Sequence, residues 1–566
     1  MNQILAIACW CLCTLPVLSQ EPLEHVWARR VGSSNENEKL WRMAVDEGGN
    51  VFVTGYFRGT FAEQDVSVTS VGGADVLLLK YSPQGELLWA RSAGGPLGDG
   101  AYGVDTDKDG NVYITGTFSG LAVFGDTILV VSHPEEIDLP FSFVARYSPS
   151  GELVWVRAME AEMVAGSYPF GQSYAVRVGP GGDLIICGTY ASTDASVENP
   201  ALSTLTFGGQ PFRTCTVPYE STYVMRMDTL GNTEWVHTVG GLNGQGVFQS
   251  IAFDTGGNIW VGGNVVSNVG SPYVDGQVNL GASATTTYTG GVMRLSGTGD
   301  PISGFLLSST NTSNVEDLIV AGNGDIYLSG WHRGSLFNSP SATQVDGFLM
   351  RVSNSGSPIW TKRLTGPGSD FFSGIATTTE PNEIVGGAYY FFDADLEGAD
   401  LAASPGNTSA LVRLDTMGTV LEVVQPEVLS GYSLIADVQS DLFGNFYLCG
   451  DVGGEVRYGP DTITCLSQDM YVAKLSPQVS TGVEPEEIND RSLLTGYPNP
   501  TDGLIRISGS AALGSFELLD AHGRLVRRFT PQGQDPILDL GGLAPGIYVL
   551  TDGQGAATRI ALQATE

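Results

Sequence analysis

The phrase Gly49-Asn50-Val51-Phe52-Val53-Thr54-Gly55 decides the fold of this chain, because related phrases occur seven times. Each phrase joins a tight turn, a short apolar strand and a closing glycine. Successive closing glycines are 57 to 75 residues apart, and the other copies lie at 111–116, 183–188, 258–263, 325–330, 382–387 and 445–450. Self-similarity of this kind indicates a repeat architecture.

A second phrase follows each copy of the first. It is an alternating strand with one basic residue, a turn, and a strand that often holds tryptophan, as in 75–89 and 143–155. Each unit thus supplies four strands, named a to d in chain order, and seven such units predict an all-β, seven-bladed β-propeller. A β-helix, which needs shorter rungs, and a row of separate sandwiches, which needs more strands per unit, remain alternatives.

The two ends of the repeat region fit together. The seventh unit stops after 471–479 and has no strand d, whereas 25–29 (His-Val-Trp-Ala-Arg) resembles the strand d residues 88–91 (Leu-Trp-Ala-Arg). We therefore expect the N-terminal strand to complete the last blade and remove its open sheet edge.

These units resemble the bacterial seven-bladed propeller repeat family built on D-x-x-G-N-x-Y-x-T-G. The resemblance covers 24–479; it is strong in units one, two and seven and weak in unit six, where Glu380-Pro381-Asn382-Glu383 replaces the Gly-Asn turn. It implies a fold and no particular activity.

The composition and charge of the chain restrict the kinds of binding partner that we expect. The 566 residues carry a formal net charge of −34, spread among strands and turns. Such a field repels phosphate backbones, so nucleic acid and anionic membrane surfaces are disfavoured, while cations and neutral glycans remain open.

The first residues are interpreted as an export signal. The apolar run 4–18 is too short to span a bilayer and ends in a small-residue cleavage pattern, which predicts a signal peptide over 1–19. A buried N-terminal strand is the alternative, because the segment has no Lys or Arg before its apolar run. No later segment resembles a membrane helix, so we do not expect an integral membrane protein.

Four cysteines follow the leader. Cys187 and Cys449 each precede the strand b glycine of their unit, and Cys215 and Cys465 lie in the following b–c connections. Because the pattern recurs and the predicted compartment is oxidising, we expect disulfides Cys187–Cys215 and Cys449–Cys465, with free thiols as the alternative.

The long b–c connections share one face of the predicted propeller with the d–a loops. Variable loops on a rigid scaffold often bind ligands, and these loops are rich in aromatic residues that can stack on sugar rings. The candidate ligand-binding residues are Trp331, His332, Tyr389, Tyr390, Phe391 and Asp393. Packing of these side chains beneath their own loops is the alternative.

Two further patterns recur or stand out in the sequence, an acidic segment and a series of basic residues. Asp105, Asp107, Asp109 and Asn111 match the first half of a calcium loop, but the second half is missing and the segment coincides with a repeat turn, so calcium is a possible ligand and no other cofactor is indicated. One basic residue recurs in every strand c, which we interpret as pairing with carboxylates between blades: Lys80, Arg146, Arg226, Arg294, Arg351, Arg413 and Lys474.

The C-terminal region has a different pattern. An acidic linker at 482–495 precedes 496–566, whose strand–turn–strand phrases suit a small, Ig-like antiparallel β-sandwich. Its motifs resemble the type A sorting domain of the type IX secretion system through Tyr497, Pro498, Asn499, Pro500, Gly523, Gly546 and Tyr548. The resemblance implies contact with that secretion machinery, passage through the outer membrane, and release or attachment at the cell surface.

The functional hypothesis is a secreted or surface-displayed propeller, over 20–481, that binds a glycan or a protein without catalysis. No nucleophile, phosphate loop or histidine pair with metal-ligand spacing appears, so no catalytic residue is assigned. A secreted hydrolase or lyase acting on polysaccharide or peptide, and a structural surface component, are the alternatives.

Overall fold

In the computed structural model every element of the described residues is a β-strand, and no helix among them could cross a membrane. The chain divides into two compact units, one formed by 24–476 and the other by 477–566 with 1–23. The described residues are 22–32, 38–131, 139–161, 169–192, 205–211, 221–240, 244–267, 273–274, 278–280, 288–337, 339–378, 383–397, 399–401, 407–478, 495–497, 504–508, 516–520, 525–530, 537–543, 546–551 and 557–562.

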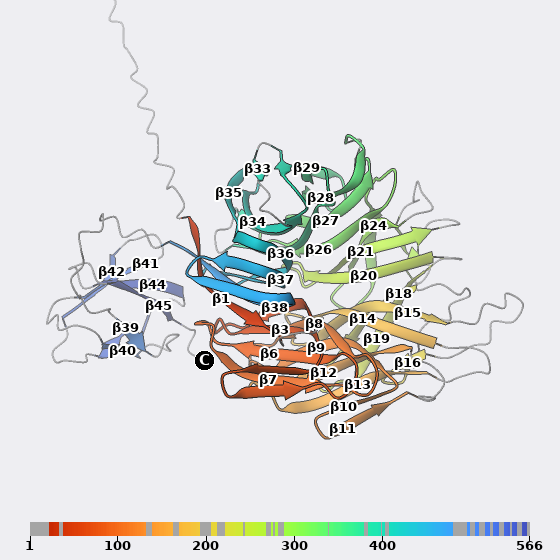
Figure 1. Ribbon diagram of the computed structural model, residues 1–566, viewed down its shortest axis with the longest axis horizontal. Helices are drawn as coiled ribbons and strands as arrows, with labels where there is room; N and C mark the ends of the chain where they lie inside the picture. The colour runs from red at the N-terminus through yellow and green to blue at the C-terminus, as the bar shows by residue number, and fades with distance from the viewer. Residues whose placement is uncertain are drawn as a thin grey trace, which may run out of the picture. The chain divides into compact units, whose positions relative to one another are not determined.

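The first unit consists of antiparallel sheets in which four strands follow the predicted order a-b-c-d (Figure 1). Each sheet is named here by its strand a. The β2 sheet contains β2 (Lys39–Val45), β3 (Val51–Phe57), β6 (Asp75–Tyr81) and β7 (Leu87–Ala93). The β8 sheet contains β8 (Gly100–Thr106), β9 (Val112–Ser119), β12 (Pro140–Tyr147) and β13 (Leu153–Ala161). The β14 sheet contains β14 (Pro169–Val178), β15 (Leu184–Ser192), β18 (Ser221–Met227) and β19 (Thr233–Gly240).

The remaining sheets of this unit repeat the same order. The β20 sheet contains β20 (Gly244–Phe253), β21 (Ile259–Ser267), β24 (Thr289–Leu295) and β25 (Pro301–Leu306). The β26 sheet contains β26 (Ser313–Val320), β27 (Ile326–Gly334), β28 (Ala342–Val352) and β29 (Pro358–Thr365). The β30 sheet contains β30 (Phe371–Thr377), β31 (Glu383–Tyr390), β34 (Thr408–Asp415) and β35 (Val420–Val424). The β36 sheet contains β36 (Glu427–Ser440), β37 (Phe446–Tyr458), β38 (Asp461–Pro477) and β1 (Leu23–Val31).

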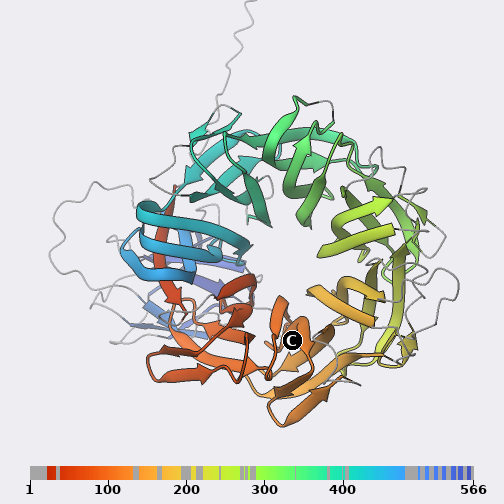
Figure 2. The same cartoon turned by 45° about the vertical axis from the view of Figure 1, so that its right-hand side comes forward.

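The sheets form a closed ring around a central axis (Figure 2). Each strand a contacts the strand a of the next sheet, from β2 through β8, β14, β20, β26 and β30 to β36, and β36 contacts β2. Strand β1 lies beside β38, so residues from the two ends of the repeat region share one sheet, as the sequence predicted. Radial four-stranded sheets in a closed ring are a β-propeller.

Short hairpins lie between strands b and c of several sheets. Two of them, β4 (Thr60–Glu63) with β5 (Val66–Thr69) and β10 (Leu121–Phe124) with β11 (Thr127–Val130), form separate two-stranded sheets. The others extend the outer edge of the preceding sheet: β16 (Leu205–Phe207) with β17 (Gln210–Pro211), β22 (Tyr273–Val274) with β23 (Val278–Asn279), and β32 (Ala394–Leu396) with β33 (Asp400–Leu401). In their described parts these long connections therefore cover outer strands d and not the axis.

The repeat phrase Asp-x-x-Gly-Asn builds the a–b turn. In the β2 sheet the carboxylate of Asp46 accepts hydrogen bonds from the backbone N–H and side-chain amide of Asn50, both at 2.8 Å. Gly49 has a φ of 78°, a left-handed conformation that glycine adopts without steric cost. Asp254 and Asn258 repeat these bonds in the β20 sheet, which explains why the phrase recurs along the chain.

Recurring tryptophan and basic side chains fasten neighbouring sheets together. Trp155 and Arg146 both donate to the backbone carbonyl of Thr229 in the next sheet, at 3.0 Å each. Trp360 and Arg351 do the same to Thr416, at 2.9 and 3.0 Å. In the described part of the chain the structure shows carboxylate partners for four of the basic residues, and each partner belongs to the same sheet as its arginine: Arg226, Arg294, Arg351 and Arg413. The bonds between sheets go to carbonyl oxygens instead.

The predicted disulfides are not formed. Cys187, Cys449 and Cys465 are buried free thiols, and Cys215 lies outside the described residues. Cys449 is opposite Val472 in the ladder of β37 with β38, whereas Cys465 is opposite Gly454, five residues farther along β37. At about 3.3 Å per residue along a strand, this register holds the two sulfur atoms apart.

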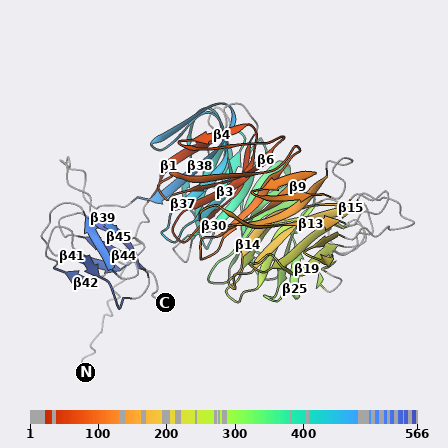
Figure 3. The same cartoon turned by 90° about the horizontal axis from the view of Figure 1, so that it is seen from below.

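The second unit contains two antiparallel sheets, and all of their strands except β43 are labelled in Figure 1, with most of them labelled again in Figure 3. One sheet has the order β39 (Thr495–Tyr497), β40 (Leu504–Ser508), β43 (Ile537–Asp539). The other has the order β42 (Leu525–Phe529), β41 (Phe516–Asp520), β44 (Gly546–Thr551), β45 (Ala557–Leu562). Side chains of both sheets bury one apolar cluster, which includes Ile505, Leu518, Leu538 and Leu550.

Candidate functional site

Every strand a of the propeller has a β-bulge at the same place. Its register against strand b shifts across one unpaired residue, and that residue lies nine positions before the Asx residue of the a–b turn. A bulge re-aims a side chain out of the regular pleat. The bulge residues, in chain order, are Trp41, Tyr102, Tyr174, Gln249, Glu316, Ser373 and Ala436.

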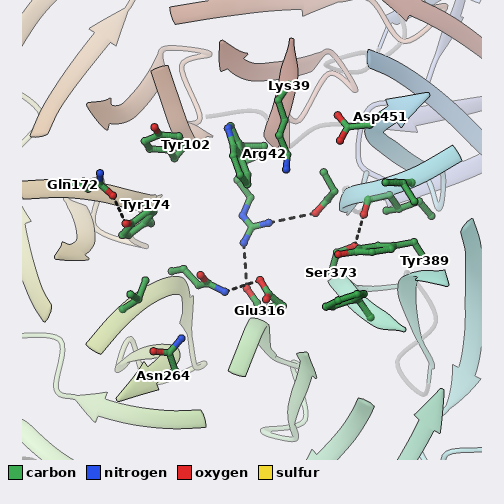
Figure 4. A pocket seen from close by; sticks show the side chains of 17 residues that line it. Lys39, Arg42, Tyr102, Gln172, Tyr174, Asn264, Glu316, Ser373, Tyr389 and Asp451 are labelled. Carbon is green, nitrogen blue, oxygen red and sulfur yellow. Dashed lines mark hydrogen bonds between the residues drawn. The ribbon is translucent and has the colours of Figure 1, made fainter. Parts of the chain in front are cut away.

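All of these bulge residues line one cavity of about 580 Å³ on the propeller axis (Figure 4). Residues near the start of strand a and just after the glycine of strand b complete its wall, among them Lys39, Asn264, Tyr389 and Asp451. These positions belong to the end of the ring where the d–a and b–c connections lie. The cavity, called here the channel cup, is therefore on the face that the sequence predicted for binding.

One side of the channel cup is aromatic. Trp41 meets Tyr102 edge-on with ring centroids 5.7 Å apart, and Tyr102 lies 5.9 Å from Tyr174. The ammonium group of Lys39 is 3.9 Å from the centre of the Trp41 ring, a cation–π contact. Three consecutive sheets thus present aromatic rings to the cup.

A second aromatic group lies across the cup. Phe371 and Tyr389 stack with centroids 4.7 Å apart, and Trp331 packs edge-on against Phe371 at 6.3 Å. In Figure 4, Tyr389 lies opposite Tyr102 and Tyr174. A ligand in the cup would meet ring faces or edges from both sides.

Glu316 organises the polar part of the wall. Its carboxylate accepts hydrogen bonds from the Trp331 indole N–H, the Asn314 amide and the Gln249 amide, each at 2.7 Å. Asn314 in turn accepts a bond from the Asn264 amide at 2.8 Å. The network fixes the orientation of side chains from two neighbouring sheets before any ligand binds.

Three buried polar atoms of the channel cup have no hydrogen-bond partner among the described residues. They are the indole Nε1 of Trp41, the amide Oδ1 of Asn264 and the carboxylate Oδ1 of Asp451. Buried polar groups are normally paired, so such atoms mark places where a water or a ligand group belongs. Burial raises the pKa of Asp451 to about 6, and nearby Lys39 opposes that rise.

The floor of the cup is Arg42. Its guanidinium donates to the backbone carbonyls of Glu316 at 3.2 Å and of Ala436 at 3.4 Å, so it reaches from β2 to β26 and β36. Burial lowers the pKa of Arg42, but Asp437, Asp317 and Glu316 together raise it above its ordinary value. The side chain therefore stays positively charged, and backbone carbonyl groups of two other sheets hold it in place.

The channel cup is suited to stacking and hydrogen bonding. Its formal charges balance, since Lys39 and Arg42 face Glu316 and Asp451. The described histidines do not line it. His332 in particular is fully buried, its ring bonds the Gly334 carbonyl at 3.0 Å, and burial lowers its pKa to about 4.

The predicted ligand-binding residues are brought to the cup only in part. Tyr389 lines it, and Trp331 supports it through Glu316 and Phe371. His332 and Tyr390 are buried in the sheets, and Phe391 and Asp393 lie in the bend after β31, away from the lining.

The predicted calcium residues do not converge. Asp107 bonds the backbone and side chain of Asn111 in the a–b turn, while Asp105 accepts from the backbone N–H of Val178 in the next sheet. Asp109 is exposed. Among the described residues no group of three or more His, Cys, Asp or Glu side chains is arranged to hold a metal ion.

The bulge residues were missed by sequence reasoning. Their side chains differ from sheet to sheet, so no residue pattern marks them. Their distance from the Asx residue of the turn is nevertheless constant, and counting nine residues back from each turn would have found all of them.

Part of the second unit matches a known protein family. Residues 495–560 match the family described as the secretion system C-terminal sorting domain. This segment is a type IX sorting domain. It indicates export through the type IX secretion system to the cell surface or the extracellular space. Within the sorting domain, Tyr497 lies in β39 and Gly546 and Tyr548 in β44, while Pro498, Asn499, Pro500 and Gly523 lie outside the described residues.

A relative and several solved structures are similar to larger parts of the chain. An uncharacterized WD repeat-containing protein of Acanthamoeba polyphaga mimivirus is 22% identical over 71% of this chain, which spans about a third (34%) of that relative's length. Similar solved structures include the Swd1 β-propeller domain of Myceliophteria thermophila, with 7% identity, a TM-score of 0.36 and coverage of 80% of this chain and 100% of that one. An ulvan lyase has 12% identity, a TM-score of 0.37 and coverage of 77% and 96%. At these scores no residue or activity is transferred to this chain.

Proposed function

We propose that this chain is an exported seven-bladed β-propeller that binds a neutral saccharide in the channel cup without catalysis. In this proposal 1–19 is a signal peptide, 20–481 the propeller, 482–495 a linker, and 496–566 an Ig-like sorting module that engages the type IX machinery. The sequence repeat and the sheet order support the blade count.

The unpartnered polar atoms of the channel cup carry the proposal. Trp41 Nε1 is a donor, and Asn264 Oδ1 and Asp451 Oδ1 are acceptors; because the atoms themselves are buried, a small rotation of each side chain brings them to a ligand in the cup. A hydroxyl group both donates and accepts, so a polyhydroxylated ring can satisfy atoms of both kinds. The aromatic residues beside them supply surfaces for the apolar faces of such a ring.

Charge favours an uncharged ligand. The two cations and two carboxylates of the cup balance, and the whole chain carries a net charge of −34, which repels polyanions. Lys39 and Asp451 are not within ion-pair distance of each other, so a ligand hydroxyl can accept from one and donate to the other.

The test is a screen of the full chain against immobilised neutral and acidic glycans, followed by calorimetry on the glycans that bind. Trp41→Ala removes one aromatic wall and should weaken binding at least tenfold. Phe392→Ala is the matched control, because Phe392 is 65% exposed and does not line the cup. Equal losses in both variants, or binding to acidic glycans alone, would contradict the proposal.

Glycoside cleavage is a second candidate, favoured by one observation. A carboxyl group with a pKa near 6, such as Asp451, suits a general acid, and Glu316 is a second carboxylate in the same cup. Cleavage would be established if the protein released new reducing ends from a bound glycan and the Asp451→Asn variant did not. The three donors on Glu316 favour the binding role.

A further inference from the structure

An arginine side chain lies across the channel beneath the cup. Arg42 crosses the axis there and bonds the carbonyls of Glu316 and Ala436, which belong to two other sheets (Figure 4). A second cavity, lined by Arg42 and by residues that follow the bulges in several strands a, has a volume of about 20 Å³. Such a space holds about one water molecule and no sugar ring.

Arg42 is held in this position from below as well. Asp317 and Asp437 line the small lower cavity with Arg42. Both are buried and tied to the ring: Asp437 accepts from the backbone N–H of Met43 at 2.9 Å, and Asp317 accepts from the Ser250 hydroxyl at 2.6 Å. Arg177 also lines this cavity, but Arg42 is the larger electrostatic influence on Asp437, so moving its guanidinium aside would weaken the charge compensation of a buried carboxylate, which is unfavourable.

From this geometry we infer that the channel cup recognises the end of a saccharide chain and not its interior. The inference rests on the saccharide-binding function proposed above. A cup of about 580 Å³ is the size of a pocket for a drug-sized ligand, or about two to three sugar rings. A chain that enters it meets Arg42 and stops, whereas an internal segment would need a groove open at both sides or a channel open at both ends.

The first experiment counts binding sites per mass of polymer. Laminarin, xylan, mannan and soluble cellulose oligomers are each offered to the full chain as the polymer and as a partial hydrolysate of the same mass, and stoichiometry is measured by calorimetry. For the probe that binds, we expect about one protein per chain, so the number of sites per mass rises in proportion to the number of chain ends. A number of sites that stays constant on hydrolysis would overturn end recognition while leaving saccharide binding intact. No binding to any probe, in either form, would overturn both proposals.

The second experiment places the end-binding site. Ala436→Tyr fills the cup at a bulge position where two other sheets already carry tyrosine, Tyr102 and Tyr174, so the fold should tolerate the change. Binding of the hydrolysate should fall at least tenfold, with the thermal unfolding midpoint unchanged. End-proportional binding that survives in a folded Ala436→Tyr variant would locate the site elsewhere and overturn the inference.

Discussion

Lys80 and Trp89 face each other across the ladder of β6 with β7, and both donate to one atom in the next sheet, the backbone carbonyl oxygen of Pro149. The distances are 3.3 Å from the Lys80 ammonium and 3.2 Å from the Trp89 indole. The turn that carries Pro149 ends at Gly151, and the Trp89 ring packs directly on that glycine. Contacts of this kind repeat around the ring and join one sheet to the next.

Gly151→Ala should destabilise the propeller more than Gly257→Ala. Both glycines have positive φ in turns of the same hydrogen-bond pattern, so each substitution costs about 1–2 kcal/mol of conformational strain. A Cβ atom on residue 151 would lie 2.9 Å from the Trp89 ring, whereas one on residue 257 meets nothing within 4 Å. We expect a further loss of about 2 kcal/mol for Gly151→Ala by denaturant unfolding. Equal losses would show that the contact contributes nothing.

Asp75 should make stability depend on pH. It is fully buried, and burial raises its pKa to about 6, against an ordinary value near 4. The folded chain therefore binds a proton that the unfolded chain releases, and this contribution is complete below about pH 4 and lost as the pH rises through 6. Asp75→Asn stays neutral, so relative to wild type it should gain about 2 kcal/mol in unfolding free energy between pH 4 and pH 7. The control is Asp65→Asn on the exposed surface, and a pH-independent difference for Asp75→Asn would contradict the prediction.

The buried cysteines should behave as unreactive thiols. Cys187, Cys449 and Cys465 are unpaired, and burial raises the pKa of all three. Because the thiolate is the reactive form, these residues should resist a thiol-specific chromogenic reagent in the folded protein and react at once in guanidinium. Residues 20–566 contain four cysteines, so fewer than four reactive thiols after denaturation without reductant would indicate that a disulfide forms after all.

Glu316→Gln should disorder the wall of the channel cup. The carboxylate accepts from three donors, and an amide at this position would turn its own N–H₂ group toward one of them. We expect saccharide affinity to fall about tenfold and stability to fall by about 1–3 kcal/mol. Glu86→Gln, an exposed residue outside the cup, provides the matched control. An unchanged saccharide affinity in Glu316→Gln would show that the hydrogen-bond network around Glu316 does not contribute to binding.

Local patterns were strong guides to this fold. The Asp-x-x-Gly-Asn phrase predicts the a–b turn because Asp46 and Asn50 satisfy each other within five residues. The pairing of 25–29 with the last sheet was also predictable, because that segment repeats the strand d pattern of 88–91. The disulfide prediction failed because equivalent positions in a repeat say nothing about the strand register that separates Cys449 from Cys465.

The candidate site depended on contacts that no local pattern records. The sequence by itself determined the repeat, the strands, their turns and the sorting domain, because these follow from short-range hydrogen bonding, alternation and motifs within a few residues. Only the tertiary structure decided which residues share the channel cup. Trp41, Glu316 and Ala436 are each more than a hundred residues apart in the chain, and they meet because each strand a bulges at one position and ring closure aims all those bulges at one axis.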